Sequence, residues 1–279
     1  MQRTRWKKSS VLLFILFIII AAITLFPLYC ITLASFKPGV ELLRYGLNTK
    51  IDPPIMSFHN YIQLFSGDNG YFNWFKNSFV ITIVQTALSL ILSALVGYGF
   101  AMYQFRFKNL IFTCVLITMM IPMEILMLPL YEMMIGMKLM DTMWGIILPF
   151  LAAPLPIFFF RQYLSGIPKD FLDAARVDGC TEYGIFARIM LPLMAPAFAA
   201  MGIFVAMNSW NNFLWPLIIL RSPEKLTLPI GLASLLTPYG NSYDLLVAGS
   251  VFSVLPVLIL FFCFQKYFIA GMTAGGVKG

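Results

Sequence analysis

The side chains best suited to chemistry are a few polar groups that lie within long apolar stretches of the sequence. They are Gln85, Glu124, Asn208, Trp210, Asn211 and Asn212. Amides can hydrogen-bond to sugar hydroxyls, and the face of an indole ring can stack on a sugar ring, so this set could line a path for a carbohydrate. The amides could equally bond between helices, and the tryptophans could lie in an aromatic belt at a membrane surface. The sequence leaves both interpretations open.

Glu124 stands apart because a carboxylate within an apolar segment is costly and is by default a functional candidate. It lies between Pro122 and Pro129, which suggest a broken helix. The alternative is a carboxylate near the outer end of its segment that bonds to backbone or water. Both interpretations of this residue remain open at this level.

The chain lacks the sequence patterns of the common catalytic sites. It has no phosphate-binding loop with a Gly-Lys pair, no HExxH pattern and no nucleophile elbow. Its only histidine is His59, and its 4 cysteines form no CxxC pair. We therefore predict that the chain is not an enzyme, and that it has no catalytic residue, metal ligand or cofactor of its own.

Composition favours a membrane protein. Hydrophobic residues make up 60% of the 279 residues and charged residues only 11%, whereas a soluble domain carries roughly 25% charged residues. Six apolar stretches approach the length of about 20 residues that a membrane-crossing helix needs, which predicts an all-α polytopic membrane protein with six transmembrane helices and one domain, residues 1–279. The stretches are Val11–Leu33, Phe79–Ala101, Leu110–Leu130, Met143–Phe160, Leu193–Leu220 and Leu245–Phe268.

The second stretch also carries a spacing of small residues. Ser89, Ser93 and Gly97 lie four residues apart, so they share one face of a helix. Small residues at that spacing let two membrane helices approach closely. The spacing predicts that this span packs against a neighbouring helix at Ser89, Ser93 and Gly97.

Basic residues predict the orientation of the spans. Most of the 19 lysines and arginines flank one set of ends of the apolar stretches, and such residues mark the cytoplasmic side. Both termini and segment 161–192 are then expected in the cytoplasm, and segments 36–76 and 221–244 outside the cell membrane.

The segment from about 165 to 196 has the pattern of two short helices joined by a turn. Pro168 suits a first helical turn, and Gly179 suits the left-handed position that ends a helix. Thr181 can cap the next helix, with Glu182 in its first turn, and Pro192 is expected to break that helix. Such a segment at the inner membrane face could be gripped by a partner protein or lie on lipid.

The spacing within this segment resembles the EAA–G–LP loop of binding-protein-dependent ABC importer permeases. Asp173-Ala174-Ala175 matches the opening triplet, with Asp where Glu is usual, and Ile189, Leu191 and Pro192 match the closing residues. The resemblance implies the type I ABC importer permease fold and a coupling helix that seats in a cytoplasmic ATPase. The residues that it assigns to ATPase coupling are Asp173, Ala174, Ala175, Asp178, Gly179, Leu191 and Pro192.

The C-terminal segment 271–279 resembles the tail of maltose-type (carbohydrate uptake) permeases, which implies that Gly275, Gly276 and Lys278 lie at the ATPase interface. Stretches such as Asn208–Pro216 and Pro238–Asp244 are most similar to arabino-oligosaccharide permeases of Gram-positive bacteria. The resemblance implies a carbohydrate import permease in the plasma membrane. Its implied partners are a second homologous permease, an ATPase dimer that binds ATP and Mg, an extracellular solute-binding lipoprotein that segment 221–244 contacts, and an oligosaccharide.

Other functions are weighed against this expectation. A secondary, ion-coupled transporter would usually show several acids within its spans and an internal repeat, whereas only Glu124 is plain here. An ABC importer for a non-arabinose sugar or for a glycerol phosphate-type substrate would share the loop motif and remains an alternative. The basic residues form no continuous stripe, which argues against a nucleic-acid partner.

Overall fold

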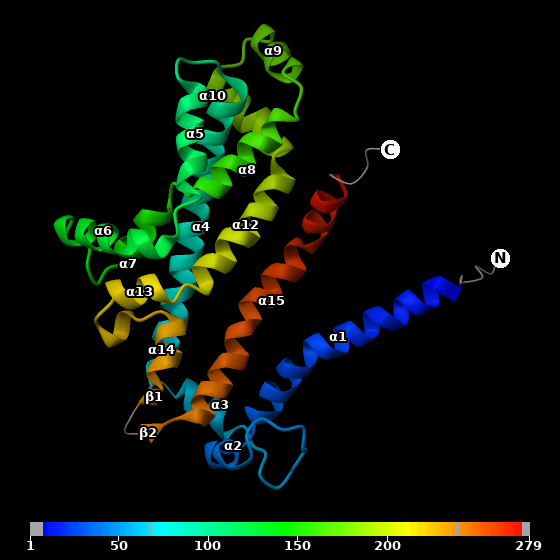
Figure 1. Cartoon of the computed structure of the whole chain (residues 1–279), viewed down its shortest axis with the longest axis vertical. Coiled ribbons are helices and arrows are strands. Elements are labelled where there is room, and N and C mark those ends of the chain that lie inside the picture. The colour runs from blue at the N-terminus through cyan, green and yellow to red at the C-terminus, as the bar shows by residue number, and fades with distance from the viewer. Residues whose placement is uncertain (1–7, 67–68, 238–239, 275–279) are drawn as a thin grey trace. The chain divides into compact units, whose positions relative to one another are not determined.

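The computed structural model describes residues 8–66, 69–237 and 240–274, and its described part is mostly helical. Figure 1 follows the elements in chain order. Besides the elements introduced below, the described part contains four short helical segments and one small hairpin. They are α2 (Gly39–Tyr45), α3 (His59–Phe65), η3 (Pro223–Lys225), α14 (Leu228–Ser234), and strands β1 (Leu236–Thr237) and β2 (Gly240–Asn241), which pair antiparallel.

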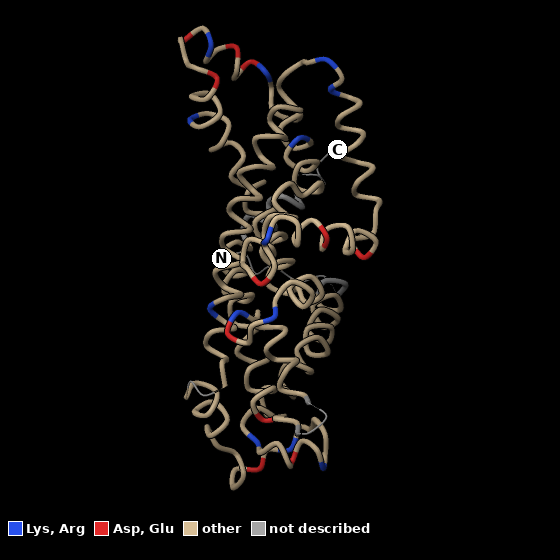
Figure 2. Tube along the Cα trace, turned by 90° about the vertical axis from the view of Figure 1, so that its left-hand side faces the viewer, with Lys and Arg blue, Asp and Glu red and all other residues tan. Residues whose placement is uncertain are grey.

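Three long helices are apolar enough to cross a membrane without a break. They are α1 (Lys8–Ala34), α4 (Tyr71–Met102) and α15 (Tyr243–Ala274), with spans at Val11–Ala34, Tyr71–Met102 and Tyr243–Gln265. At about 1.5 Å of rise per residue, each span exceeds the roughly 30 Å of a hydrocarbon core. Along the chain trace, charged residues gather in turns and near helix ends, and long helical stretches carry none (Figure 2).

Three further candidate spans are bent pairs of helices, and six spans result if each pair is counted as one. The pair α5 (Lys108–Thr118) and α6 (Met123–Gly136) bends by 103°. The break falls at Pro122, as the sequence suggested, whereas Pro129 lies inside α6. The stretch Leu110–Leu130 is therefore not a straight helix, because the Pro122 ring cannot supply the N–H that would continue the helical bonding.

The other two pairs bend less sharply. The first pair joins α7 (Met143–Ile147) and η1 (Leu148–Phe150) to α8 (Pro154–Ser165) with a bend of 43°. The second joins the segment Glu182–Leu193 to α12 (Ala195–Trp210) with a bend of 76°. The stretch predicted as Leu193–Leu220 is also interrupted at its far end, where a turn at Asn211 separates α12 from α13 (Leu214–Ile219).

The chain divides into two compact units, which are described separately. One contains Met1–Phe72 and Gly231–Leu255. In it the hydroxyl of buried Tyr71 donates to the carbonyl of Gly249 at 3.0 Å. A Cβ at Gly249 would lie 2.7 Å from a Leu232 methyl carbon and 2.9 Å from the Tyr71 ring, so any other residue would displace these side chains.

The other unit contains Asn73–Ile230 and Pro256–Gly279. Its largest apolar core joins buried residues of α4, α8 and α12 to the segment between α8 and α12, and it includes Tyr98, Phe160, Leu172, Ile185 and Met201. This core fixes the 165–196 segment to the ends of three helices.

The close helix contact predicted at Ser89, Ser93 and Gly97 is confirmed. Ser89 and Ser93 are fully buried. A Cβ at Gly97 would lie 2.7 Å from the Phe160 Cβ and 2.9 Å from the Arg161 backbone nitrogen. Gly97 therefore allows α4 and α8 to approach more closely than any other residue type would.

We expect Gly97→Ala to destabilise the protein, because the added methyl group forces the backbone of α8 away from α4. Overpacking of this kind costs about 1–3 kcal/mol. Gly99→Ala is the matched control, since its Cβ would meet no atom within 4 Å and alanine favours a helix. The temperature at which the purified, detergent-solubilised chain loses half of its monodisperse peak is the measurement. Equal temperatures for both variants would contradict the close contact.

Candidate functional site

The first helix of the 165–196 segment, α9 (Asp170–Val177), ends in a glycine turn. Gly179 has a φ of 77°, the left-handed region that the sequence predicted for it. The Cys180 N–H donates to the Ala175 carbonyl at 3.0 Å, and the Gly179 N–H donates to the Arg176 carbonyl at 3.0 Å. These two bonds are the pair that defines a Schellman end, so the turn satisfies the free carbonyls of the helix.

The second helix begins at the predicted cap. The Thr181 hydroxyl accepts a bond from the Gly184 N–H at 3.2 Å, at the start of α10 (Glu182–Ile185). A π-helical turn, η2 (Phe186–Met190), and α11 (Leu191–Leu193) follow directly. The break expected at Pro192 comes later, at Met194, because the wide turn before the proline keeps the chain helical through it.

The faces of α9 differ sharply. Leu172 and Ala175 are buried in the core, whereas Ala174 and Asp173 are exposed. The two alanines of the motif therefore lie in different surroundings, one packed inside the chain and one on its surface. Outside the core the segment also exposes large apolar side chains, with Val177 89% and Tyr183 88% exposed.

The remaining motif residues also lie at the surface. Asp178 is the C-cap residue directly after α9, and it is exposed together with Gly179. Leu191 and Pro192 of α11 are exposed as well. The tail residues Gly275, Gly276 and Lys278 lie outside the described residues.

A polar network holds the segment together. Arg176 donates to Asp173 at 3.2 Å and to both oxygens of Glu182 at 2.8 and 3.2 Å, and the Tyr103 hydroxyl donates to the same Glu182 carboxylate. The Arg176 guanidinium lowers the pKa of the Glu182 carboxyl, with a further contribution from Tyr103. Burial, followed by the bond to Glu182, raises the pKa of Tyr103. The sequence placed Glu182 in the first turn of the second helix, as the structure has it, but it assigned no role to Glu182 or to Tyr103.

The polar residues predicted within the spans meet at one cavity of about 730 Å³. Five of the six candidates line it: Gln85, Glu124, Asn208, Asn211 and Asn212. They come from α4, from α6, and from the end of α12 with the turn that follows. Among the residues that line this cavity there is no lysine, arginine or histidine.

The broken helices place these groups. Glu124 lies in the first turn of α6, directly after the 103° bend, where a negative charge is favoured by the helix dipole. Asn208 and Asn211 each donate to a carbonyl four residues earlier, at 2.8 and 2.9 Å. Each amide keeps its oxygen and a second N–H for another partner. Gln85 is buried and accepts a bond from Ser209 at 3.1 Å, which leaves its amide hydrogens available.

Trp210 is not among the residues that line the cavity. It is buried, with its ring edge-on to Phe75 at 5.5 Å between centroids. Trp215 lines the cavity instead, and its Nε1 donates to the Gly145 carbonyl at 3.1 Å. The difference follows from the turn after Trp210, which gives Trp215 a new direction that a continuous helix would not have given it.

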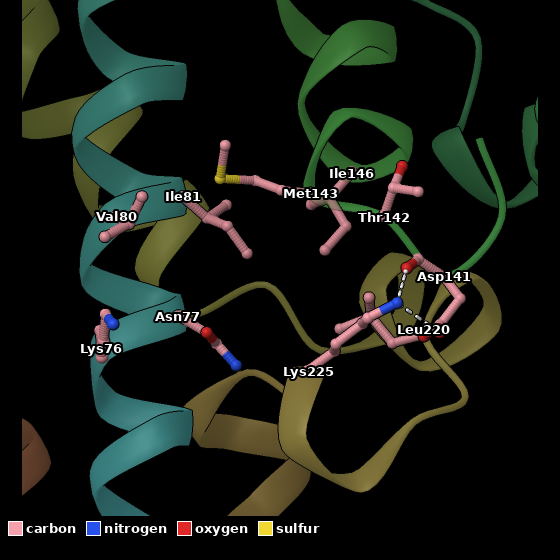
Figure 3. Close-up of a pocket in the computed structure, with 10 residues that line it drawn as sticks. All are labelled: Lys76, Asn77, Val80, Ile81, Asp141, Thr142, Met143, Ile146, Leu220 and Lys225. Atoms are coloured by element: carbon pink, nitrogen blue, oxygen red, sulfur yellow. Dashed lines mark hydrogen bonds and ion pairs between the residues drawn. The ribbon is translucent and has the colours of Figure 1, made fainter.

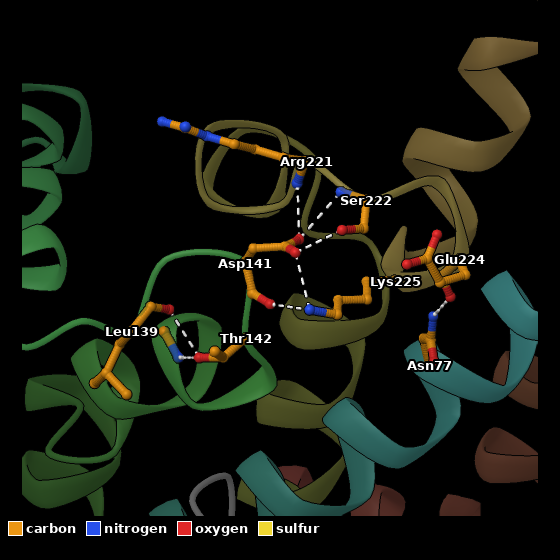
Figure 4. A network of polar contacts seen from close by, with 9 residues as sticks. Asn77, Leu139, Asp141, Thr142, Arg221, Ser222, Glu224 and Lys225 are labelled. Carbon is orange, nitrogen blue, oxygen red and sulfur yellow. Dashed lines mark hydrogen bonds and ion pairs between the residues drawn. The ribbon is translucent and has the colours of Figure 1, made fainter.

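A second polar network centres on Asp141, between α6 and α7 (Figure 4). Its carboxylate accepts bonds from the backbone N–H groups of Arg221 and Ser222 at 3.0 and 3.1 Å. The Ser222 hydroxyl donates at 2.6 Å and the Lys225 ammonium at 2.9 Å. Lys225 first, and then Ser222, lower the pKa of Asp141. One carboxylate thus fixes the segment around η3 to the turn before α7.

A cavity of about 380 Å³ adjoins this network and is lined by five apolar and five polar residues (Figure 3). Its polar groups are largely engaged, because Asn77 donates to the carbonyls of Glu224 and Leu226 and Lys225 pairs with Asp141. None of the polar residues predicted within the spans lines it. It therefore adds no candidate to the larger cavity.

We expect Asp141→Asn to lower stability by roughly 1–2 kcal/mol at pH 7, because hydrogen bonds to a charged acceptor are lost. Since the folded-state pKa of Asp141 is lowered, its contribution is present above its unfolded value of about 3.9 and disappears as the pH falls through the folded value. The loss should therefore be the same from pH 5 to pH 8, measured by thermal unfolding.

The control for Asp141 is Asp52→Asn, which removes a single ion pair to a largely exposed Lys50 and should change stability little. A variant of Asp141 as stable as that control would contradict the structural role of the network.

The sequence matches, over residues 89–274, the family described as "Binding-protein-dependent transport system inner membrane component". It is 58% identical over 263 residues to the arabinooligosaccharides transport system permease protein AraQ of Bacillus subtilis, covering 94% of each chain. It is 56% identical over the full length of the AraQ protein of Halalkalibacterium halodurans. The lactose transport system permease protein LacG of Rhizobium radiobacter is 40% identical over 73% of this chain and 74% of that protein.

The fold is similar to a chain in the crystal structure of a bacterial ABC transporter involved in the import of the acidic polysaccharide alginate. The TM-score is 0.80 with 24% identity, over 94% of this chain and 99% of that one. This likeness confirms the predicted fold of an ABC importer permease. The family match covers 186 residues of this chain, and the AraQ protein of Halalkalibacterium halodurans matches it over its full length. Both findings confirm the resemblance predicted from the loop. This multi-pass membrane chain therefore belongs to the family of binding-protein-dependent transport system inner membrane components.

Proposed function

We propose that this chain is one of two permeases in an ATP-driven importer of arabino-oligosaccharides. The observation that carries the proposal is the 56–58% identity to AraQ proteins over nearly the whole chain. The cavity supports it, because Gln85 and the three asparagines offer neutral amide groups of the kind that bond sugar hydroxyls. Other sugar permeases among the relatives are clearly less similar, including LacG at 40%.

The chemistry of the cavity disfavours an anionic cargo. A glycerol phosphate-type substrate would need cationic partners, and arginine or lysine usually supplies them. The lining has none and carries the carboxylate of Glu124. An ion-coupled transporter is disfavoured by membership of a family whose transport depends on a binding protein. The cavity therefore suits an uncharged sugar.

The partners follow from this class of transporter. A second, homologous permease would close the cavity, and a cytoplasmic ATPase dimer would bind ATP and Mg. An extracellular binding protein would deliver the sugar to segment 221–244. Both termini and segment 165–196 would lie in the cytoplasm, as the distribution of lysine and arginine predicts. The tail residues Gly275, Gly276 and Lys278 would lie at the ATPase interface.

Segment 165–196 would be the part that the ATPase holds. Its surface presents Asp173, Ala174 and the exposed side chains of Val177 and Tyr183, while Ala175 packs inside and steadies the helix. Large exposed apolar side chains at a water-facing end of a chain mark a surface that a partner covers. Asp178, Gly179, Leu191 and Pro192 would shape this surface rather than make its central contacts.

The four-component complex in lipid vesicles tests the function. We expect ATP to drive uptake of arabino-oligosaccharides by vesicles without an ion gradient, and galacto- and malto-oligosaccharides to be taken up poorly. Uptake driven by an ion gradient without ATP would reject the proposal. Glu124→Gln should lower the uptake rate about tenfold, which corresponds to one hydrogen bond to a charged group. Glu132→Gln, an exposed glutamate of the same helix that does not line the cavity, should have no effect.

We expect Gly179→Pro to abolish ATP-driven uptake. Proline cannot adopt a φ of 77° and has no N–H to donate to the Arg176 carbonyl. Gly179→Asn is the matched control and should retain most uptake, because asparagine tolerates the left-handed region and a side chain there would meet no atom within 4 Å. Both variants should be present in the membrane at wild-type amounts, measured by immunoblot. Full uptake by Gly179→Pro would contradict the proposal that segment 165–196 couples ATP hydrolysis to transport.

A further inference from the structure

One carboxylate connects three parts of the chain at the 165–196 segment. Glu182, in the first turn of α10, accepts two bonds from Arg176 of α9 and one from the hydroxyl of Tyr103. Tyr103 directly follows the last residue of α4. The contact between residues 103 and 182 therefore joins the two short helices to the end of a long helix that is distant in sequence.

Tyr103 is held so that its hydroxyl can reach this carboxylate. Its ring lies edge-on to the Tyr98 ring at 5.5 Å between centroids. The Lys108 ammonium donates to the Tyr103 backbone carbonyl at 2.8 Å. Both contacts come from residues on either side of the α4–α5 turn. The position of Tyr103 is thus fixed by its own neighbourhood, independently of Glu182.

The polar contact does what the apolar core beneath it cannot do. Leu172, Ala175 and Ile185 pack with Tyr98 and Met102 of α4 in one core, but apolar contacts are non-directional and permit sliding. A guanidinium that donates to both oxygens of a carboxylate fixes orientation as well as distance. Exposed ion pairs add little stability, so the geometry of this contact is its main consequence.

The long helix leads from this contact to the cavity. Gln85 lies 18 residues before Tyr103, about 27 Å along a helix at 1.5 Å per residue, and it lines the cavity of about 730 Å³. Between them α4 is unbroken, whereas Glu124 directly follows the break at Pro122. A displacement at the C-terminal end of α4 is therefore delivered directly to the cavity wall.

We infer that Tyr103 and Glu182 are positioning residues that transmit movement of the α9–α10 segment to α4 and, through it, to the cavity wall at Gln85. The inference rests on the proposed function, in which a cytoplasmic ATPase moves α9. When the ATPase displaces α9, Arg176 carries Glu182 with it, and the Glu182–Tyr103 bond turns or shifts the end of α4. Without that bond α9 slides over the apolar core, and neither α4 nor the cavity wall at Gln85 moves with it.

Two substitutions separate transmission from docking, both made in the complete complex in vesicles. Tyr103→Phe removes one hydroxyl and leaves the ring packed on Tyr98. Glu182→Gln removes the charge and one of the two acceptor oxygens, so the two-point bond from Arg176 that fixes the orientation of residue 182 is lost. For each, we expect ATP hydrolysis to stay near wild type while uptake falls about fivefold, within the range for residues coupled in one network. The number of ATP molecules hydrolysed per sugar rises accordingly.

The double variant tests whether the two residues act as one link. Tyr103→Phe with Glu182→Gln should lose no more uptake than either single change, because groups that act as a unit are not additive. Glu132→Gln is the charge-matched control. The number of ATP molecules that it hydrolyses per imported sugar should equal that of the wild-type complex. Co-purification of the ATPase with each variant reports that the complex has assembled.

Three results would overturn the inference while leaving the proposed function in place. Uptake and ATP hydrolysis that fall by the same factor would assign the contact to docking or stability. Wild-type uptake by both single variants would show that the bond carries no movement, and fully additive losses would show that the residues act separately. A wild-type complex that shows no ATP-driven uptake would reject the proposed function, and the inference with it.

Discussion

The constraint on which this structure depends is that every backbone N–H and C=O within a membrane needs a partner inside the protein. Long helices meet it along their whole length, as α1, α4 and α15 do. A helix can break at membrane depth only where the released backbone groups face a cavity or are buried in protein. The break at Pro122 is at such a place, since Met123 and Glu124 directly after it line the cavity of about 730 Å³. The sites of interrupted bonding and the sites of polar side chains therefore coincide.

The sequence predicted the straight helices well and the broken ones less well. Hydropathy located α4, but the helix begins at Tyr71 rather than Phe79. The extra turns are polar enough to escape an apolar window, and they hold because Trp74 and Asn77 donate to carbonyls of Pro223 and Glu224. Residue types do not define the angle between two helices. A break could therefore be predicted from Pro122, but the bend of 103° could not.

The candidate residues show the same division. Five of the six polar candidates share one cavity, because an amide or a carboxylate in an apolar stretch is expensive and is kept where it has a polar use. Trp215 lines the cavity in place of Trp210, because the turn at Asn211 ends the helical register between them. The sequence contains no pattern that marks Asp141 or Tyr103 as the centre of a polar contact. Their partners are 80 and 79 residues away in sequence, and neither lies in a recognisable pattern.

Two contacts in the unit that contains Asn73–Ile230 share one arrangement, in which several donors bind a single carboxylate. Asp141 accepts from two backbone groups, a hydroxyl and an ammonium, whereas Glu182 accepts only from side chains. Backbone donors hold a segment in one conformation, but side-chain donors can move with the elements that carry them. Asp141 therefore suits a fixed joint, and Glu182 suits a joint between parts that shift. The similarity in fold to a chain from an alginate importer at 24% identity fits this division, because a shared fold leaves cargo and coupling to such individual side chains.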